Sequence, residues 1–150
     1  MSPSDLIDTR GPRFAATITL LVLAVVLLTK SPWLLLAQTL VFALGARFGP
    51  QRAPYGLLYR YFVKHRLAPA SKFEDAKPPQ FAQAVGTLFG VLGLAGVVIG
   101  VPALFLGAAA AAFAAAFLNS VFGYCLGCEM YLLVKRASHQ MVTSRAFVAK

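Results

Sequence analysis

The sequence contains little charge, and very little of it is acidic. Only 5 of the 150 residues are Asp or Glu, and charged residues make up 13% of the chain. A soluble globular domain is about one-quarter charged and about half apolar. The composition therefore excludes an ordinary soluble enzyme. A hydrophobic fraction of 59% excludes intrinsic disorder as well.

Motifs that carry chemistry are also scarce. We find no catalytic triad and no dinucleotide fingerprint, and the chain has only 2 cysteines and 2 histidines. The glycine-rich segment 86–100 follows no predicted strand and lacks the Lys-Ser/Thr pair of a phosphate-binding loop. The search for a functional site therefore narrows to the cysteines.

Long apolar runs take up most of the chain. The runs 14–29 and 33–46 are separated by three residues, and a longer run, 81–134, is interrupted by Gly-Val-Pro at 100–102. We therefore expect one membrane domain over residues 1–150, all-α and polytopic, with four transmembrane helices arranged as two hairpins. The four expected helices span residues 13–30, 33–48, 80–100 and 103–135.

Two alternatives apply to the first hairpin. Its helices are somewhat shorter than the ~20 residues that span a bilayer, which leaves a shallow re-entrant pair as the minority interpretation. A cleaved signal peptide would also have a basic flank and an apolar run. No small-x-small site follows the first run and a second apolar run does, so we expect the first helix to be retained.

The cations predict the orientation. The chain has a formal net charge of +9, and in a four-helix topology every Lys and Arg except Lys30 falls on one side of the membrane. The positive-inside rule places that side in the cytoplasm. We expect a multi-pass protein of the plasma (inner) membrane with both termini cytoplasmic. Because the cations lie between apolar runs, we expect the lipid bilayer and no nucleic acid as a partner.

The polar central loop contains a second pattern, which predicts an amphipathic helix over residues 54–67 in the cytoplasmic interface. Four apolar side chains have helical spacing and are expected to face the lipid: Tyr55, Leu58, Tyr59 and Phe62. Four cations are candidates for binding anionic headgroups or a soluble partner: Arg52, Arg60, Lys64 and Arg66.

Small residues predict how the helices pack. Close backbone approach stabilises helix pairs in lipid, where the hydrophobic effect cannot. The last apolar segment has a small-residue ridge, with one larger member: Gly107, Ala111, Ala115, Asn119, Gly123 and Gly127. The third helix has its own glycines: Gly86, Gly90, Gly93, Gly96 and Gly100. The ridge is expected to face these glycines or a second copy of the chain in a homodimer. We expect Gln38 and Gln83 to form interhelical hydrogen bonds.

Cys125, Cys128 and Glu129 form the one constellation that suggests chemistry. Residues three apart on a helix share a face, so the two thiols could form a disulfide or capture a sulfur or a metal together. Glu129 lies on a neighbouring part of that face and is a candidate for proton transfer. Two cysteines without a neighbouring histidine are an incomplete metal site, so we predict no cofactor and no metal within one chain.

The depth of this motif depends on the helix that carries it. A straight helix from Pro102 to Lys135 would be about 50 Å long, against a ~30 Å apolar core. The helix must project into the cytoplasm, start later or break. A break at Gly123 would place Cys125 near a helix N-terminus, where the helix dipole favours a thiolate, while Glu129 would oppose it.

Several segments resemble a known family. They are residues 8–14, 48–60, 78–86 and 116–132, and the most specific is Phe-Gly-Tyr-Cys-x-Gly-Cys-Glu at 122–129. They are similar to an uncharacterised, domain-of-unknown-function family of small four-helix bacterial integral membrane proteins, common in actinobacteria. The resemblance implies a four-helix membrane protein. It also implies an association with thioredoxin-like or rhodanese-type soluble partners, which favours thiol or sulfur exchange.

The leading hypothesis is a membrane component of a thiol–disulfide or sulfur-transfer system, whether or not it is itself an enzyme. Cys125 and Cys128 would cycle between dithiol and disulfide or persulfide, with Glu129 assisting. The first alternative is a structural or assembly subunit, or a small transport module, whose cysteines only pack. The second is a metal site shared by two chains.

Overall fold

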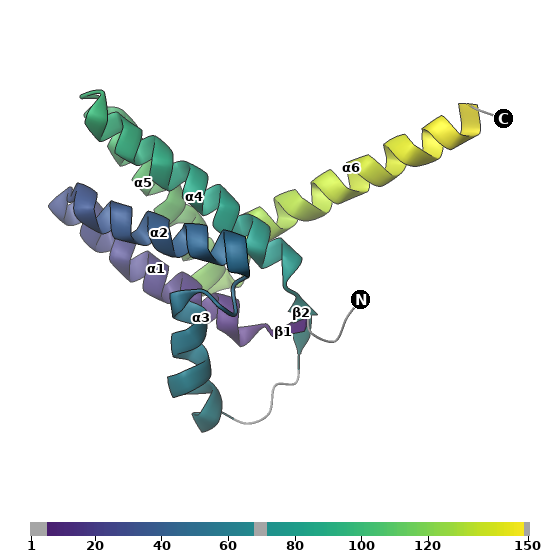
Figure 1. The fold of residues 1–150 in the computed structure, drawn as a ribbon, viewed down its shortest axis with the longest axis horizontal. Coiled ribbons are helices and arrows are strands. Elements are labelled where there is room, and N and C mark those ends of the chain that lie inside the picture. The colour runs from purple at the N-terminus through teal and green to yellow at the C-terminus, as the bar shows by residue number, and fades with distance from the viewer. Residues whose placement is uncertain (1–5, 68–71, 149–150) are drawn as a thin grey trace.

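A computed structural model describes residues 6–67 and 72–148, with side chains up to residue 138. The chain is all-α, as predicted, apart from one two-stranded sheet. Four helices form the bundle in Figure 1: α1 (Arg10–Thr29), α2 (Pro32–Phe48), α4 (Lys77–Val98) and α5 (Pro102–Phe117). A further helix, α6 (Leu126–Val148), leaves the bundle in a different direction.

Tight turns join α1 to α2 and α4 to α5. Lys30 ends α1 in the left-handed region (φ 52°), and its N–H donates to the Val26 carbonyl at 2.7 Å. Gly100, with φ 71°, turns the chain after α4. α2 and α5 each begin with proline, which suits a first helical position because it has no N–H to leave unpaired. Both turns lie at the same end of the bundle (Figure 1).

Glycines let α4 pack closely against two neighbours. A Cβ on Gly93 would lie 2.8 Å from Leu35 of α2, and one on Gly96 would lie 2.8 Å from the Phe105 nitrogen of α5. Gly86 and Gly90 face Phe42 and Thr39 of α2 in the same way. The predicted close packing of these glycines is confirmed, with α2 as the main partner. α4 therefore lies between α2 and α5.

The small-residue ridge of α5 does not face α4. Gly107 and Ala111 are exposed, and a Cβ on Gly107 would meet nothing within 4 Å. The buried side of α5 is instead made by Phe105 and by four alanines: Ala108, Ala109, Ala112 and Ala116. The expectation that the ridge packs on the third helix is wrong for α5. Because the glycines of α4 already leave room for close approach, α5 can present larger residues to that contact.

A small apolar core and a polar contact hold the bundle together. Leu23, Val26 and Leu35 are almost fully buried near the turn end. Further along, buried Gln38 donates a long 3.5 Å hydrogen bond to Thr19 and accepts one of 2.7 Å from the Tyr55 hydroxyl. The predicted interhelical hydrogen bond of Gln38 is confirmed. Gln83 differs: its buried Oε1 has no hydrogen-bond partner among the described residues.

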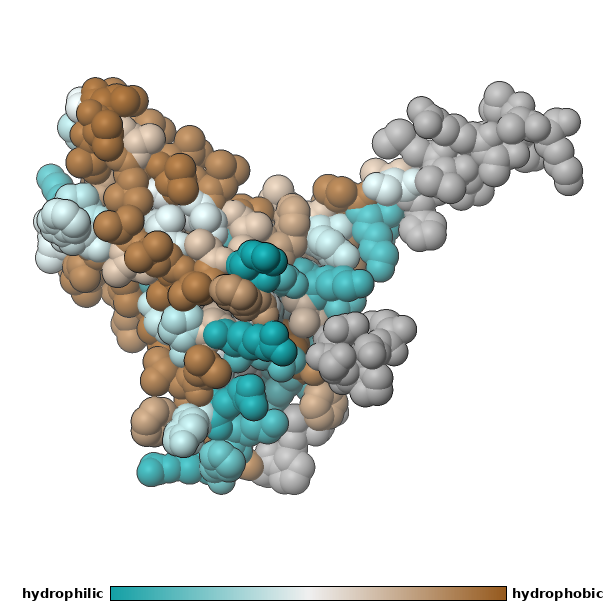
Figure 2. Space-filling model, in the orientation of Figure 1, coloured by the Kyte–Doolittle hydropathy of each residue, from teal (hydrophilic) through white to brown (hydrophobic). Residues whose placement is uncertain are grey.

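The outside of the bundle is strongly apolar. Three helical segments are long and apolar enough to cross a membrane: Arg10–Thr29, Lys77–Val98 and Pro102–Phe122. α2 is a shorter apolar helix of 17 residues. Figure 2 shows hydrophobic side chains over the helices and hydrophilic ones gathered at the end opposite the turns. These surfaces indicate that the protein associates with a lipid bilayer.

The central segment is helical from 54 to 66 but irregular. It consists of α3 (Pro54–Leu58), a π-helical turn (Tyr59–Val63) and a 3-10 turn (Lys64–Arg66). Its apolar side chains do not form one face. Tyr59 is 4% exposed and packs on the Phe14 ring of α1 at 5.7 Å, whereas Leu58 and Phe62 are exposed. The expected single lipid-facing stripe is corrected here, because α1 covers Tyr59.

A short sheet ties the N-terminus to the end of the central segment. β1 (Leu6–Asp8) pairs antiparallel with β2 (Phe73–Asp75). The Oδ1 atom of Asp8 accepts the Arg10 N–H at 3.0 Å, and that of Asp75 accepts the Lys77 N–H at 3.0 Å. Each carboxylate thus caps the start of a bundle helix, where free N–H groups favour an anion.

Candidate functional site

The cysteine motif follows a break in the last apolar segment. α5 continues through a π-helical turn, Leu118–Phe122, and ends at Gly123 with φ 69°. Residues other than glycine rarely adopt this conformation, so the helix stops here. The structure divides the single helix expected over residues 103–135 into α5 and α6. The sequence left three options for this helix: it projects into the cytoplasm, starts later or breaks. The structure has the break, and it lies at Gly123.

Three contacts fix the motif at the end of the bundle opposite the hairpin turns. The Thr17 and Ser120 hydroxyls are 3.1 Å apart. A Cβ on Gly123 would lie 3.4 Å from Cζ of Arg13. Gly127 approaches α4 so closely that a Cβ there would be 2.6 Å from Ala82. The cysteine pair therefore lies beside the starts of α1 and α4. Among the glycines of the predicted ridge, Gly127 makes a close contact with the backbone of another helix, whereas Gly107 does not.

Cys125 and Cys128 are joined by a disulfide, with their Cα atoms 5.2 Å apart. Cys125 immediately precedes α6, and its carbonyl accepts the Glu129 N–H at 3.0 Å. The Cys128 N–H is directed at the Cys125 Sγ at 3.3 Å. Cys125 is thus the N-cap of α6, with a sulfur in the place where a hydroxyl or carboxylate oxygen usually accepts. Both residues are half-buried.

Glu129 lies in the first turn of α6 and is exposed. Its position suits a carboxylate, because the N-terminal end of a helix carries partial positive charge. Its carboxylate has no hydrogen bond or ion pair with any side chain described up to residue 138. The structure places it next to the cysteines. Its role in proton transfer stays a prediction.

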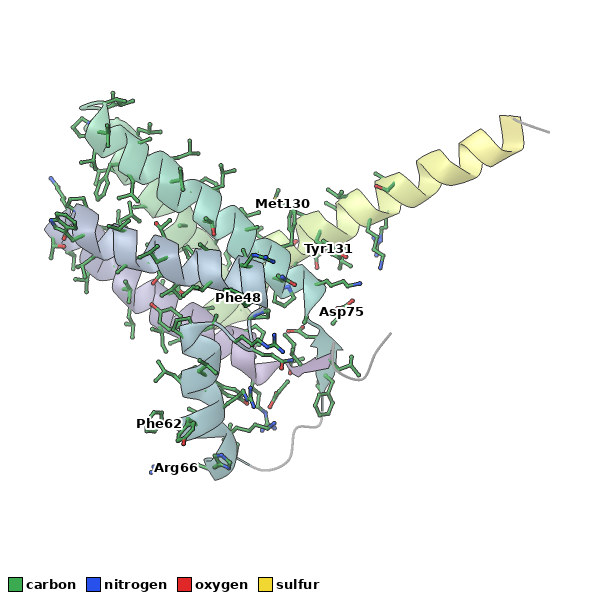
Figure 3. The ribbon with its side chains drawn as sticks, in the orientation of Figure 1. Phe48, Phe62, Arg66, Asp75, Met130 and Tyr131 are labelled. Atoms are coloured by element: carbon green, nitrogen blue, oxygen red, sulfur yellow. A yellow bond between two sulfur atoms is a disulfide. The ribbon has the colours of Figure 1, made fainter. Side chains whose placement is uncertain are left out.

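Exposed apolar residues flank the two cysteines in the sequence. Phe122 is 68% exposed, Tyr124 and Met130 are each 48% exposed, and Leu126 is 39% exposed. Tyr131 is instead held against Phe81 of α4, with ring centroids 5.8 Å apart. Figure 3 shows Met130 and Tyr131 where α6 leaves the bundle. The cysteines are therefore flanked in the sequence by four exposed apolar residues, which we call the apolar collar: Phe122, Tyr124, Leu126 and Met130.

The four cations predicted to bind a partner or headgroups are all exposed: Arg52, Arg60, Lys64 and Arg66. They lie in and just before the helical segment 54–66, which we call the α3 segment. This segment leaves the bundle on a different side from α6 (Figure 1). Figure 3 shows Arg66 at the far tip of that segment, away from Met130. The structure does not bring these cations to the cysteine pair.

Sequence reasoning missed two features near this end of the bundle. The first is Arg13, which it used only to predict orientation and which lies against the residue that breaks the helix. The second is the hydrogen bond from the Tyr59 hydroxyl to Asp8 Oδ2, 2.8 Å long. Burial, aided by this bond and by the Asp8 charge, raises the pKa of Tyr59 to about 12. The sequence signal for the role of Asp8 was its position ahead of a predicted helix, where a carboxylate can cap the free N–H groups.

Metal ligands do not gather in the part of the chain that the structure describes. Those residues contain no group of three or more His, Cys, Asp and Glu side chains that could hold a metal ion. A metal on Cys125 and Cys128 would therefore need ligands from elsewhere, as the alternative with two chains supposes.

Comparison with protein families gives a match over most of the chain. The family model described as "Domain of unknown function (DUF4395)" matches residues 7–136. No curated protein and no solved structure matches the chain significantly. The matched range includes the short sheet, the four bundle helices, the disulfide and the first half of α6. The chain belongs to the DUF4395 family.

Proposed function

We propose that this protein is a membrane component of a thiol–disulfide or sulfur-transfer system that uses Cys125 and Cys128. The observation that carries the proposal is their disulfide at the start of α6. A disulfide stabilises mainly by closing a long loop of the unfolded chain, and this one closes a single helical turn. A structural role therefore explains little of this disulfide, and reversible exchange explains its half-buried position at the end of the bundle better.

The exchange reaction balances without a cofactor. When two thiols of a partner reduce the pair, the partner gains a disulfide and Cys125 and Cys128 take up two electrons and two protons. In the sulfur-transfer form, a cysteine thiolate attacks the outer sulfur of a donor persulfide. The donor leaves as a thiolate, and the cysteine then carries the persulfide. Glu129, one turn along α6, would accept or return a proton.

The proposed topology has four transmembrane helices and both termini in the cytoplasm of the plasma membrane. α2 is short, but it runs beside α4 from Leu35, which faces Gly93, to Gly45, which faces Gln83. This pairing supports a full crossing by α2. Lys30 is at the turn end, and the α3 segment with its cations is at the other, which the positive-inside rule places inside.

A soluble partner of the thioredoxin-like or rhodanese type would dock at the cytoplasmic end. The exposed apolar collar next to the cysteines in sequence suits the rim of such a partner's active site. The cations of the α3 segment would attract anionic lipid headgroups, or an acidic side of that partner. Both the collar and the cations are exposed at this end of the bundle.

The test is a redox titration of the full-length protein in native membranes. Samples equilibrated at set thiol–disulfide potentials are quenched with acid, alkylated with a mass tag and weighed. We expect two-electron behaviour, with the dithiol and the disulfide each dominant within the range of thioredoxin-class proteins, about −270 to −120 mV. A reduced thioredoxin-class protein should convert the disulfide to two free thiols.

The double variant Cys125→Ser, Cys128→Ser is the matched control, because it keeps the size of both side chains and removes the redox pair. Two cysteines that stay free at every potential would contradict the proposal and favour a packing role. A disulfide that no dithiol protein reduces would contradict it too. Metal bound to the purified wild type but not to the double variant would favour the metal site shared by two chains.

The exposed ridge of α5 supports a homodimer as part of this proposal. Gly107 and Ala111 leave room for a second helix to approach closely. In the background without cysteines, Gly107→Cys should crosslink to itself in membranes more readily than Leu88→Cys, on the exposed side of α4. Equal crosslinking at both positions would remove the homodimer.

A further inference from the structure

The two sulfurs of the disulfide have different surroundings. Cys125 is the N-cap of α6, and its Sγ receives the Cys128 N–H at 3.3 Å. Cys128 lies inside the first helical turn, and no backbone N–H of the described residues is directed at its Sγ. Negative charge is favoured at a helix N-terminus, where free N–H groups point out of the helix. Of the two thiolates, that of Cys125 is better stabilised.

A cation lies beside the same position. A Cβ on Gly123, two residues before Cys125, would be 3.4 Å from Cζ of Arg13 and 3.6 Å from its Nε and Nη2. The guanidinium of α1 thus lies flat against the helix break, in space that a side chain at 123 would fill. The helix terminus and Arg13 are independent sources of positive potential near the start of α6, where Cys125 lies two residues after Gly123.

Other charged and titratable groups lie on the adjoining elements. They are Arg10 of α1, Asp75 and Lys77 at the start of α4, Glu129, Lys135 and Arg136 of α6, and the hydroxyls of Tyr124 and Tyr131. Asp75 is occupied in capping α4. Glu129 opposes a thiolate, and because its carboxylate and the Arg13 guanidinium are both exposed, water and salt screen the two effects alike.

We infer that Cys125 is the thiol that reacts first with a partner and that Arg13 positions and stabilises its thiolate. This inference rests on the proposed function. The Cys125 thiolate attacks one sulfur of a partner disulfide, forming a mixed disulfide and releasing the other partner sulfur as a thiolate. Cys128 then loses its proton and attacks the Cys125 sulfur. This step closes the intramolecular disulfide and releases the second partner thiolate.

The test measures alkylation rate against pH in full-length protein held in lipid nanodiscs. Cys128→Ser leaves Cys125 as the single thiol, and Cys125→Ser leaves Cys128. At pH 7 we expect Cys125 to react about tenfold faster than Cys128, with its rate profile reaching half-maximum at a lower pH. This assay needs no redox partner, so its outcome is separate from that of the redox titration.

Arg13 is tested in the protein whose single thiol is Cys125. Arg13→Gln should slow alkylation at pH 7 roughly three- to tenfold and move the half-maximum to higher pH. Arg13→Lys should restore most of the rate. The plateau at high pH should stay unchanged, which shows that folding and access to the thiol are intact. Arg47→Gln is the matched control, because its guanidinium stacks on Phe48 at the same end of the bundle.

Two results would overturn the inference. One is a Cys128 thiol that reacts faster than Cys125 at pH 7. The other is an Arg13→Gln effect no larger than that of Arg47→Gln. If Arg13→Gln and Arg13→Lys both lose the plateau at high pH, Arg13 is needed for packing of the helix break. That result would likewise reject the electrostatic role.

Discussion

Tyr59 donates a 2.8 Å hydrogen bond to one oxygen of Asp8, whose other oxygen caps the start of α1 at Arg10. One carboxylate therefore holds the central segment against the first bundle helix. The Phe14 ring covers the same tyrosine. The α3 segment is thus anchored at its middle and free at its exposed tip.

Removing this hydroxyl should loosen the anchor. We expect Tyr59→Phe to lower the free energy of unfolding by about 1 kcal/mol, because a hydrogen bond to a charged acceptor is lost while the ring still packs. Tyr61→Phe is the control, since Tyr61 is 81% exposed. Unfolding of the two variants by denaturing detergent in mixed micelles gives the comparison. Equal stability of both variants would show that the bond contributes nothing.

The same tyrosine predicts a loss of stability in alkali. Its pKa is raised from 10.0 to about 12 in the folded protein, so folding favours the neutral phenol. The stabilisation that the neutral Tyr59 phenol gives the folded state is fully present below pH 10 and is lost as the pH rises from 10 to about 12. Thermal unfolding of wild type and Tyr59→Phe across this range measures it. The difference between the two proteins should shrink, and a constant difference would contradict the assignment.

Close packing of α4 makes its glycines intolerant of a methyl group. A Cβ on Gly90 would overlap Thr39, whose hydroxyl already donates to the Leu35 carbonyl at 2.7 Å. Gly90→Ala should therefore cost about 1–3 kcal/mol of stability through overpacking. Gly107→Ala on α5, where a Cβ meets nothing within the chain, should cost nothing when the protein is measured as a detergent-dispersed monomer. Similar losses at both positions would mean that helix composition, and not packing, sets the effect.

The helix break depends on the left-handed conformation of Gly123. Gly123→Val should destabilise the protein by about 1–2 kcal/mol or straighten the break, because a branched side chain disfavours φ 69°. Gly123→Asn should be milder, since Asn adopts this region more readily. Spin-label distances between the bundle and α6 report the direction of the helix. The same distance distribution in both variants and wild type, with equal stability, would refute this role of Gly123.

The proposed topology predicts which positions a membrane-impermeant thiol reagent reaches. In the background without cysteines, Lys30→Cys should be labelled in intact cells, because the first turn lies outside. Tyr61→Cys should be labelled only after the cells are opened. Both positions are exposed, so access to the membrane side alone decides the result. Labelling of both in intact cells would exclude the four-helix arrangement.

The helices and their turns could be predicted because their causes are local. Apolar runs define α1, α4 and α5, and the proline that opens α5 follows the Gly-Val pair that turns the chain. Lys30 and Gly100 take left-handed conformations where the polar breaks occur. The glycines of α4 are also read directly from their spacing, because close approach has few other causes.

What the sequence could not supply is the choice of face. The ridge at Gly107 and Ala111 and the buried side at Ala108 and Ala112 differ by one position on a nearly uniform alanine helix. Apolar periodicity is too weak there to decide between them. The burial of Tyr59 could not be predicted for a similar reason. An aromatic side chain in the membrane interface and a buried one have the same spacing along a helix.

The cysteine site was predicted in part. Its residues and the helix break follow from the C-x-x-C spacing and from Gly123. The neighbour that matters for charge does not, because Arg13 is more than 100 residues away in sequence and reaches the site only through the contact of α1 with the end of α5. Such a contact leaves no trace in local composition.

The polar contact at Gln38 has a consequence for biosynthesis. Its partners, Thr19 and Tyr55, both precede α4 in the chain, so the amide is satisfied before α4 has been made. The leading pair of helices can thus wait in lipid without an unpaired amide while the ribosome completes the remainder. The later pair then docks through the glycines of α4 and a 2.7 Å hydrogen bond that Gln80 donates to the Ala46 carbonyl of α2.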